Sequence, residues 1–444
     1  MKIRKLTHLQ FISLGFAVMI LLGTLLLSLP VASQSGEPTS LLTSMFTAVS
    51  ASCVTGLVLV DTATHWSLFG QIVIITLIQI GGLGFMTIAT LLFSFVRKNL
   101  GLRSRAIMAE SINTTHIAGL KKLTGKIIIG TLIFEGIGAG LLSVRFISEF
   151  GIAKGIYYSV FHAISAFCNA GFDLMGIKEP FCSLVDYSDD ILVNITLMLL
   201  ITIGGIGFLV WDDIYTNKHH FKRYHLHTKI VLTVSFILTF GGAFLFWLFE
   251  KDLSLSGLSA KEQILTSLFS SVTVRTAGFN TVDLNGLSDA SVLFLSGLMF
   301  IGGSSGSTAG GIKTTTIAVI VIFLFYGLRS KRRPQLFGRA LEENSVKKAS
   351  SVMFFNFILA FAALVAICAL QDFNVRDVIF EAFSAMGTVG MSTGITRDLT
   401  TVSKCIIMFL MYCGRVGSTS FALALLEKKV DPPVLCPVEN ITIG

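Results

Sequence analysis

A short segment that contains a glycine occurs four times in the chain. It reads VSASCVTGL at residues 49–57, ISAFCNAGF at 164–172, SSVTVRTAGFN at 270–280 and FSAMGTVGM at 383–391. Each copy has a Ser, then a small or apolar pair, and then a glycine followed by a large apolar residue. The glycines recur at roughly 110 residues, which indicates one unit built four times.

The glycine is the constant feature of these segments, and its neighbours vary. Glycine tolerates backbone conformations that let peptide carbonyl oxygens turn towards a common axis. Rings of carbonyls can replace the hydration shell of a monovalent cation, and four copies would supply four oxygens per ring. The candidate ion-binding residues, through their backbones, are therefore Val54, Thr55, Gly56, Asn169, Ala170, Gly171, Thr276, Ala277, Gly278, Thr388, Val389 and Gly390.

The composition indicates a membrane protein. Hydrophobic residues make up 53% of the 444 residues and charged residues only 14%, against about 25% charged residues in soluble proteins. The apolar run at residues 11–29 is long enough to span a bilayer and has no convincing cleavage site, so we expect a first membrane helix there and no signal peptide.

Each unit follows the same order of elements. Long apolar helices are expected at 11–29, 122–148, 228–249 and 350–370, and short helices at 41–52, 154–167, 261–273 and 375–386. Second long helices are expected at 70–96, 190–215, 290–327 and 402–426. A helix of a dozen residues reaches about 18 Å, half a bilayer, so each short helix predicts a re-entrant pore loop. The four helix C-termini would bring partial negative charge to one point.

The predicted fold is an all-α polytopic membrane protein with four pseudo-symmetric membrane–pore loop–membrane repeats around one central pore. The repeats are expected at 1–97, 98–218, 219–330 and 331–430, followed by a cytoplasmic tail at 431–444. The second helices share a glycine pattern near Gly81, Gly204, Gly302 and Gly414, which we interpret as close helix packing. A longer second unit indicates a loop insertion at residues 173–190.

The distribution of charge predicts the topology. Most of the 34 Lys and Arg residues lie at the N-terminus, at Lys428 and Lys429, and in segments 97–126, 218–229 and 327–348, whereas the alternate loops carry most acids. The positive-inside rule then places both termini in the cytoplasm, with the short helices entering from outside. The net charge of +8 is therefore explained by the basic cytoplasmic loops, and nucleic-acid binding is not expected.

In the third repeat, the second long helix contains an unusual stretch, GGSSGSTAGGIKTTT, at residues 302–316. Its glycines and hydroxyl residues favour a loop in the middle of a span. The stretch satisfies GxSxG, but the surroundings lack the His/Asp pair of a hydrolase, and Ile312 replaces the glycine that a Walker loop needs before its Lys. We therefore do not expect an enzyme.

These motifs, above all SSVTVRTAGFNTVD at 270–283 and GGSSGSTAGGIKTTT at 302–316, are similar to those of the TrkH/KtrB/HKT superfamily of potassium-translocating membrane subunits, most like KtrB. The resemblance covers nearly the whole chain. It implies one filter glycine per repeat and, because all four positions are glycine here, a K⁺-selective site at the filter residues. It also implies that the 302–316 loop obstructs the pore below the filter. Gating residues would then be Gly302, Gly303, Ser304, Ser305, Gly306, Gly310, Gly311, Lys313 and Arg415.

Four charged residues within the predicted membrane region need separate interpretation. We expect Arg415 to face the pore, limit cation passage and contact the 302–316 loop; the alternative is a buried partner for a carbonyl or a carboxylate such as Glu135. Lys313 is either a positive plug or a snorkelling lysine. Arg275 is expected to bond filter backbone as a scaffold. The role of Glu135 stays open.

The resemblance also implies partners. A homodimer of pore subunits and a cytosolic nucleotide-binding regulatory ring of the KtrA/TrkA type are expected, the ring on the basic face, which could also contact membrane lipids. No cofactor is expected in this chain, since it has no Rossmann glycine fingerprint; K⁺ is the expected transported ion and Na⁺ is a second candidate. The resulting prediction is K⁺ uptake across the cell membrane, with a dependence on Na⁺ left open. The alternatives are a Na⁺-permeable or ion-coupled symporter and a non-conducting membrane scaffold subunit.

Overall fold

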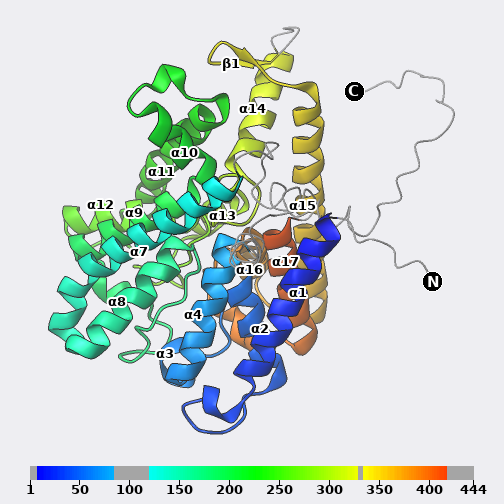
Figure 1. Ribbon diagram of the computed structural model, residues 1–444. Helices are drawn as coiled ribbons and strands as arrows, with labels where there is room; N and C mark the ends of the chain where they lie inside the picture. The colour runs from blue at the N-terminus through cyan, green and yellow to red at the C-terminus, as the bar shows by residue number, and fades with distance from the viewer. Residues whose placement is uncertain (1–7, 85–119, 329–333, 418–444) are drawn as a thin grey trace.

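The computed structural model describes residues 8–84, 120–328 and 334–417, and this part of the chain is mainly helical (Figure 1). Four long helices are α1 (His8–Leu27), α7 (Leu120–Phe150), α11 (Leu226–Glu250) and α15 (Glu343–Leu370). Each is followed by a short helix, namely α2 (Leu41–Ser52), α8 (Ile152–Phe167), α12 (Ala260–Thr273) and α16 (Val375–Gly387).

Further helices follow the four glycine-containing segments. They are α4 (Leu68–Leu83), α9 (Ile191–Gly205) with α10 (Phe208–Asn217), α13 (Asp289–Phe300) with α14 (Thr314–Leu328), and α17 (Thr401–Val416). The smaller elements are η1 (Pro30–Ala32), α3 (Thr62–His65), η2 (Val185–Tyr187), η3 (Phe221–Arg223), η4 (Ile395–Asp398) and the antiparallel strands β1 (Gln335–Leu336) and β2 (Arg339–Ala340). Figure 1 shows β1 and α3 at opposite ends of the molecule.

The long helices have the length and surface of membrane spans. Within the described residues, four helices are long and apolar enough to cross a bilayer, and α9 with α10 would make a fifth, broken span. Large apolar side chains stay exposed on their outer faces, such as Leu21, Leu132, Phe244 and Phe361. Exposed apolar surface on this scale is expected where lipid tails are the solvent. The chain is therefore a multi-pass membrane protein.

The predicted first helices and short helices are confirmed, with one displaced boundary. Helix α15 begins at Glu343, before the expected residue 350, because the apolar run by which it was predicted leaves out a first part of the helix with polar side chains such as Lys347 and Lys348. The expected repeat boundaries near residues 97 and 330, the basic segment up to residue 119, and the tail at 431–444 lie outside the described residues.

The prediction of uninterrupted second helices is wrong. Helix α4 ends at Gly84 (φ 84°), α9 and α10 meet at 95° beside Gly207 (φ 100°), and α17 ends at Gly417 (φ 91°). A positive φ cannot continue a right-handed helix, so a glycine in that conformation ends it. The predicted third interruption is confirmed at residues 301–313, although Thr314–Thr316 already form the first turn of α14.

The units pack on one another in a cyclic order. Helix α4 contacts α8, α9 contacts α12, α13 contacts α16, and α17 returns to α2. The predicted close packing at the second-helix glycines is confirmed, since a Cβ atom on Gly81, Gly204 or Gly414 would meet a carbonyl oxygen of a short helix: that of Ser52, Phe167 or Met386, respectively. The short helices therefore approach the second helices at backbone distance.

This packing predicts opposite effects for the same substitution at two helical glycines. Gly204→Ala should lower the melting temperature in detergent, at a cost of about 1–3 kcal/mol, because its methyl group would collide with the Phe167 carbonyl. Gly241→Ala, in the middle of α11 with open space around it, should keep or raise stability by up to about 1 kcal/mol through better helix propensity. Equal melting temperatures for the two purified variants would contradict the packing argument.

Candidate functional site

The four glycine segments, residues 54–56, 169–171, 276–278 and 388–390, share one backbone pattern. The first and third residues of each segment have positive φ, and the middle residue does not. This alternation turns successive carbonyl groups towards the same side of the segment. The positive angles are 58° and 95° at Val54 and Gly56, 60° and 68° at Asn169 and Gly171, 84° and 84° at Thr276 and Gly278, and 52° and 97° at Thr388 and Gly390.

The four glycines contact one another through the preceding carbonyls. A Cβ atom on Gly56 would lie 2.5 Å from the oxygen of Ala170, and one on Gly171 would lie 2.6 Å from that of Ala277. A Cβ atom on Gly278 would meet the Val389 oxygen, and one on Gly390 would meet the Thr55 oxygen. The contacts thus run from each segment to the next and return to the first, so that backbone from all four units lies within one small ring.

The N–H groups of these segments point back to the short helices. The middle residue of each donates to a carbonyl in the last turns of its own helix at 2.8 Å: Thr55 to Ser50, Ala170 to Ser165, Ala277 to Thr273 and Val389 to Ser384. Among the described residues, no hydrogen bond ends on the carbonyl oxygens of the four segments. These oxygens are free to bind a ligand, and such a ring can coordinate a dehydrated monovalent cation.

A hydroxyl group from each short helix braces the same segments. Ser50 and Ser384 accept from the N–H groups of Gly56 and Gly390 at 3.0 and 3.1 Å. Ser165 and Thr273 donate at 2.7 Å to the carbonyls of the residues after the other two glycines, Phe172 and Phe279. The recurring Ser was visible in the sequence, but its role in three of the segments, and that of Thr273 in the other, was missed there, because a hydrogen bond across six or seven residues depends on how the helix ends.

The loop at residues 301–313 lies against one side of this ring. Ser304 donates from its N–H to the Gly205 carbonyl at 3.0 Å, and Gly311 donates to the Gly414 carbonyl at 3.2 Å. A Cβ atom on Gly310 would meet the Thr388 hydroxyl, so the loop touches the fourth glycine segment directly. The expected gating residues are therefore brought together with the expected ion-binding residues.

The loop is also closed on itself. Ser304 and Ser305 contact the hydroxyls of Thr314 and Thr315 at 2.9 and 3.1 Å. Gly302 lies against the Gly310 carbonyl, Gly303 lies against Ala309, and Gly306 accepts from the N–H of Phe208 at 2.8 Å. Lys313 donates to the carbonyls of Ala309 and Gly310 at 2.8 and 3.1 Å, so its ammonium group stays within the loop.

Arg415 joins the loop to the first unit. Its guanidinium donates to the carbonyls of Thr308 and Gly81, and to that of Gly82 at 2.9 Å. The predicted contact with the loop is confirmed. Glu135 accepts from Gln79 at 3.0 Å, and the described partners of Arg415 are backbone carbonyls.

Arg275 differs from the prediction. Its described hydrogen bond goes to the Thr239 hydroxyl of α11 at 2.5 Å, rather than to the backbone of the glycine segment that follows it. Its side chain is buried, 8% of it exposed. Arg275 therefore ties the third short helix to the preceding long helix, which is still a structural contact.

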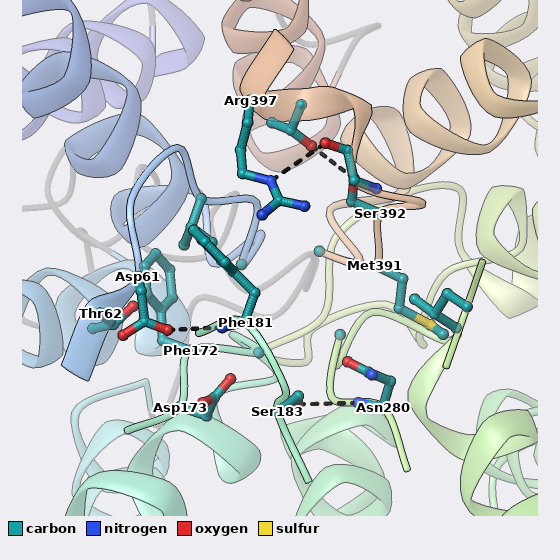
Figure 2. A pocket seen from close by; sticks show the side chains of 18 of the residues that line it. Asp61, Thr62, Phe172, Asp173, Phe181, Ser183, Asn280, Met391, Ser392 and Arg397 are labelled. Carbon is teal, nitrogen blue, oxygen red and sulfur yellow. Dashed lines mark hydrogen bonds between the residues drawn. The ribbon is translucent and has the colours of Figure 1, made fainter. Parts of the chain in front are cut away.

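A pocket of about 160 Å³ opens on the other side of the ring (Figure 2). All four segment glycines line it, together with Asp61, Asp173, Phe181, Asn280 and Arg397. Burial raises the pKa of the Asp173 carboxyl to about 6, and the Asp61 carboxylate acts in the same direction. The insertion at residues 173–190 was predicted as a loop, but its place over the ring was not.

Two serines on α2 provide a test of the hydroxyl braces. Ser50→Ala should lower the melting temperature of the purified protein, because it leaves the buried N–H of Gly56 unpaired, at a cost of about 1–3 kcal/mol. Ser44→Ala is the matched control, since the Ser44 hydroxyl is equally buried and finds no hydrogen-bond partner among the residues that the structure describes; this variant should be neutral or stabilising. A loss of the same size in both variants would exclude a specific brace.

Comparison with known proteins gives one consistent result. The family model for TrkH, described as a cation transport protein, matches residues 7–430. The potassium/sodium uptake protein NtpJ of Enterococcus hirae is 40% identical over 99% of this chain and 98% of its own length. The Ktr system potassium uptake protein B of Bacillus subtilis is 38% identical over 94% and 93% of the two chains.

A solved structure has the same fold. The potassium transporter TrkH from Vibrio parahaemolyticus superposes with a TM-score of 0.72 over 96% of this chain and 86% of its own, at 16% sequence identity.

Proposed function

Because the chain belongs to the TrkH family of cation transport proteins, we propose that it takes up K⁺ across the cell membrane through one channel-like pore. The observation that carries this proposal is the ring of four glycine segments with positive φ and carbonyl oxygens free of hydrogen bonds. Relatives named for potassium uptake, at 38% and 40% identity over nearly the whole chain, support K⁺ as the ion.

The pore would be built from four pseudo-symmetric repeats at 1–97, 98–218, 219–330 and 331–430. The cyclic packing of second helices on the short helices of the next unit supports this arrangement. K⁺ would bind to the carbonyl oxygens of the four glycine segments, where each short helix also directs its C-terminal partial negative charge. The hydroxyl braces would keep the oxygens at a fixed spacing, which favours one ion size over another.

The loop at 301–313 would act as the gate. It lies between the ring and the second helices, where Gly302, Gly303 and Gly310 leave no room for a side chain, and glycine gives its backbone a wide choice of conformations. Arg415 would hold the closed position by its bond to Thr308 and would also repel cations electrostatically. The bonds of Lys313 within the loop support a role in shaping the loop over one as a free plug.

The regulatory partner would lie on the cytoplasmic side. Relatives are named as proteins B and D of a Ktr system, which supports the existence of a separate subunit. We propose a homodimer, with a cytosolic nucleotide-binding ring on the basic face and both termini in the cytoplasm. Lys222 and Arg223 of η3, a segment without buried residues, belong to the described part of that face.

Gly278→Ser tests the filter. The φ of 84° and the nearby Val389 carbonyl leave no unstrained place for a side chain, so the ring should distort and lose its preference for K⁺ over Na⁺. The measurement is ⁸⁶Rb⁺ and ²²Na⁺ flux into proteoliposomes of the purified protein, with its cytosolic partner and nucleotide. Gly257→Ser is the control, because Gly257 has a similar φ of 86° and open space around it.

Three results would contradict the proposal. Selective flux that Gly278→Ser leaves unchanged would place the ion path elsewhere. Uptake that requires a Na⁺ or H⁺ gradient would favour the ion-coupled symporter. Absence of flux with the partner present would favour the non-conducting scaffold.

Arg415→Ala tests the gate. Loss of the bonds to Thr308, Gly81 and Gly82, and of the positive charge, should raise K⁺ flux by roughly tenfold, a barrier change of about 1.4 kcal/mol. Arg145→Ala, an exposed arginine paired with Glu149 and Asp190, serves as the control in the same flux assay. Unchanged rate and affinity in Arg415→Ala would exclude Arg415 from the gate.

A further inference from the structure

The loop at residues 173–190 reaches the three other units. The N–H of Phe181 donates to Asp61 Oδ2 at 3.0 Å, which ties the loop to the first unit. Ser183 accepts from the N–H of Asn280 at 3.3 Å, and Leu184 donates to the Asn280 carbonyl at 3.0 Å, which tie it to the third. The guanidinium carbon of Arg397, in the fourth unit, lies 4.3 Å from the ring centre of Phe181.

The contact between Phe181 and Arg397 joins opposite sides of the ring. The segment contacts run from the first unit through the second and third to the fourth, so the second and fourth units are not neighbours in the cycle. Both side chains line the pocket that the four segment glycines also line, and Figure 2 shows the Arg397 guanidinium directed towards Phe181. A cation that approaches the ring from this pocket therefore passes close to a guanidinium.

Arg397 shares the pocket with three acids but is not paired with any of them in the described part of the chain. Its hydrogen bond goes to the Gly394 carbonyl at 3.4 Å. The three acids have donors of their own: Asp61 accepts from the N–H groups of Ala63 and Thr64 at 3.0 and 2.9 Å, Asp173 from that of Met175 at 3.0 Å, and Asp283 from that of Asn285 at 3.0 Å. Phe181, 36% exposed, holds the guanidinium in place through its ring face.

We propose that Arg397, positioned by Phe181, is a specificity-determining residue that selects against divalent cations at the outer mouth. This inference rests on the proposed K⁺ uptake and adds the exclusion of a second class of ion. Coulomb repulsion is proportional to charge, so a fixed positive group that lowers the local K⁺ concentration by a given factor lowers that of a divalent ion by its square. For a fixed charge at an assumed separation of about 6 Å from an ion in water, Coulomb's law gives a factor of about three for K⁺.

The test uses Arg397→Gln in the proteoliposome flux assay at low ionic strength. The half-saturating K⁺ concentration should fall about threefold, and the Ba²⁺ concentration that half-blocks uptake should fall about ninefold. Both changes should disappear in 0.5 M choline chloride, where charges are screened within about 4–5 Å. Arg397→Lys should behave like the wild type towards Ba²⁺, because it keeps the charge.

Phe181→Ala is a second variant that leaves the charge in place. Without the ring face the guanidinium is free to move into solvent, so this variant should show a smaller increase in Ba²⁺ block that is also sensitive to salt. Lys178→Gln is the matched control, since Lys178 lies on the same loop but is paired with Glu149 at 2.6 Å; it should leave block by Ba²⁺ unchanged.

Each outcome bears on a defined part of the proposal. Unchanged Ba²⁺ block in Arg397→Gln, or changes that persist at high salt, would overturn the role of Arg397 and leave the proposed K⁺ uptake intact. K⁺-selective flux in the wild type, together with a change in Ba²⁺ block in Arg397→Gln that is the square of the change for K⁺, would establish both the K⁺ uptake and the role of Arg397. Absence of flux from the wild type with its cytosolic partner would refute the K⁺ uptake and this inference together.

Discussion

The central constraint in this protein is that four backbone segments present unpaired carbonyl oxygens at one point inside an apolar molecule. A buried carbonyl group without a hydrogen-bond partner is costly. Such a ring is therefore stable only if the other buried polar groups around it have hydrogen-bond partners. The short helices provide this support by accepting every middle N–H at 2.8 Å and adding a hydroxyl brace in each unit. Glycines such as Gly204 then let the second helices approach these helix ends at backbone distance.

Building the ring from one chain allows each unit to differ. In the part of the chain that the structure describes, the third unit interrupts its second helix with a loop of about a dozen residues. The fourth unit contributes Arg415, and the second contributes the insertion that carries Phe181. These additions lie on the two faces of the ring: the loop and Arg415 on one, Phe181 and Arg397 on the other. The ring itself keeps near-uniform backbone geometry while its surroundings become specialised.

The sequence predicted the repeating elements well because apolar runs and helix ends are local signals. The short helix at 41–52 was predicted to the residue, and the glycine positions stood out from their spacing. The breaks at Gly84 and Gly207 were missed, since the sequence does not distinguish a glycine that allows close helix packing from one whose positive φ ends the helix. The partners of Arg275 and Arg397 depend on contacts between distant segments, Thr239 and Phe181, which no local pattern encodes.

The 95° bend beside Gly207 brings the start of helix α10 against the loop at residues 301–313. The ten residues of α10 form a helix of about 15 Å, and its first residue, Phe208, is bonded through its N–H to Gly306 of the loop at 2.8 Å. A displacement of α10 would therefore act on the loop through this bond, which couples the loop to a helix that does not belong to the ring.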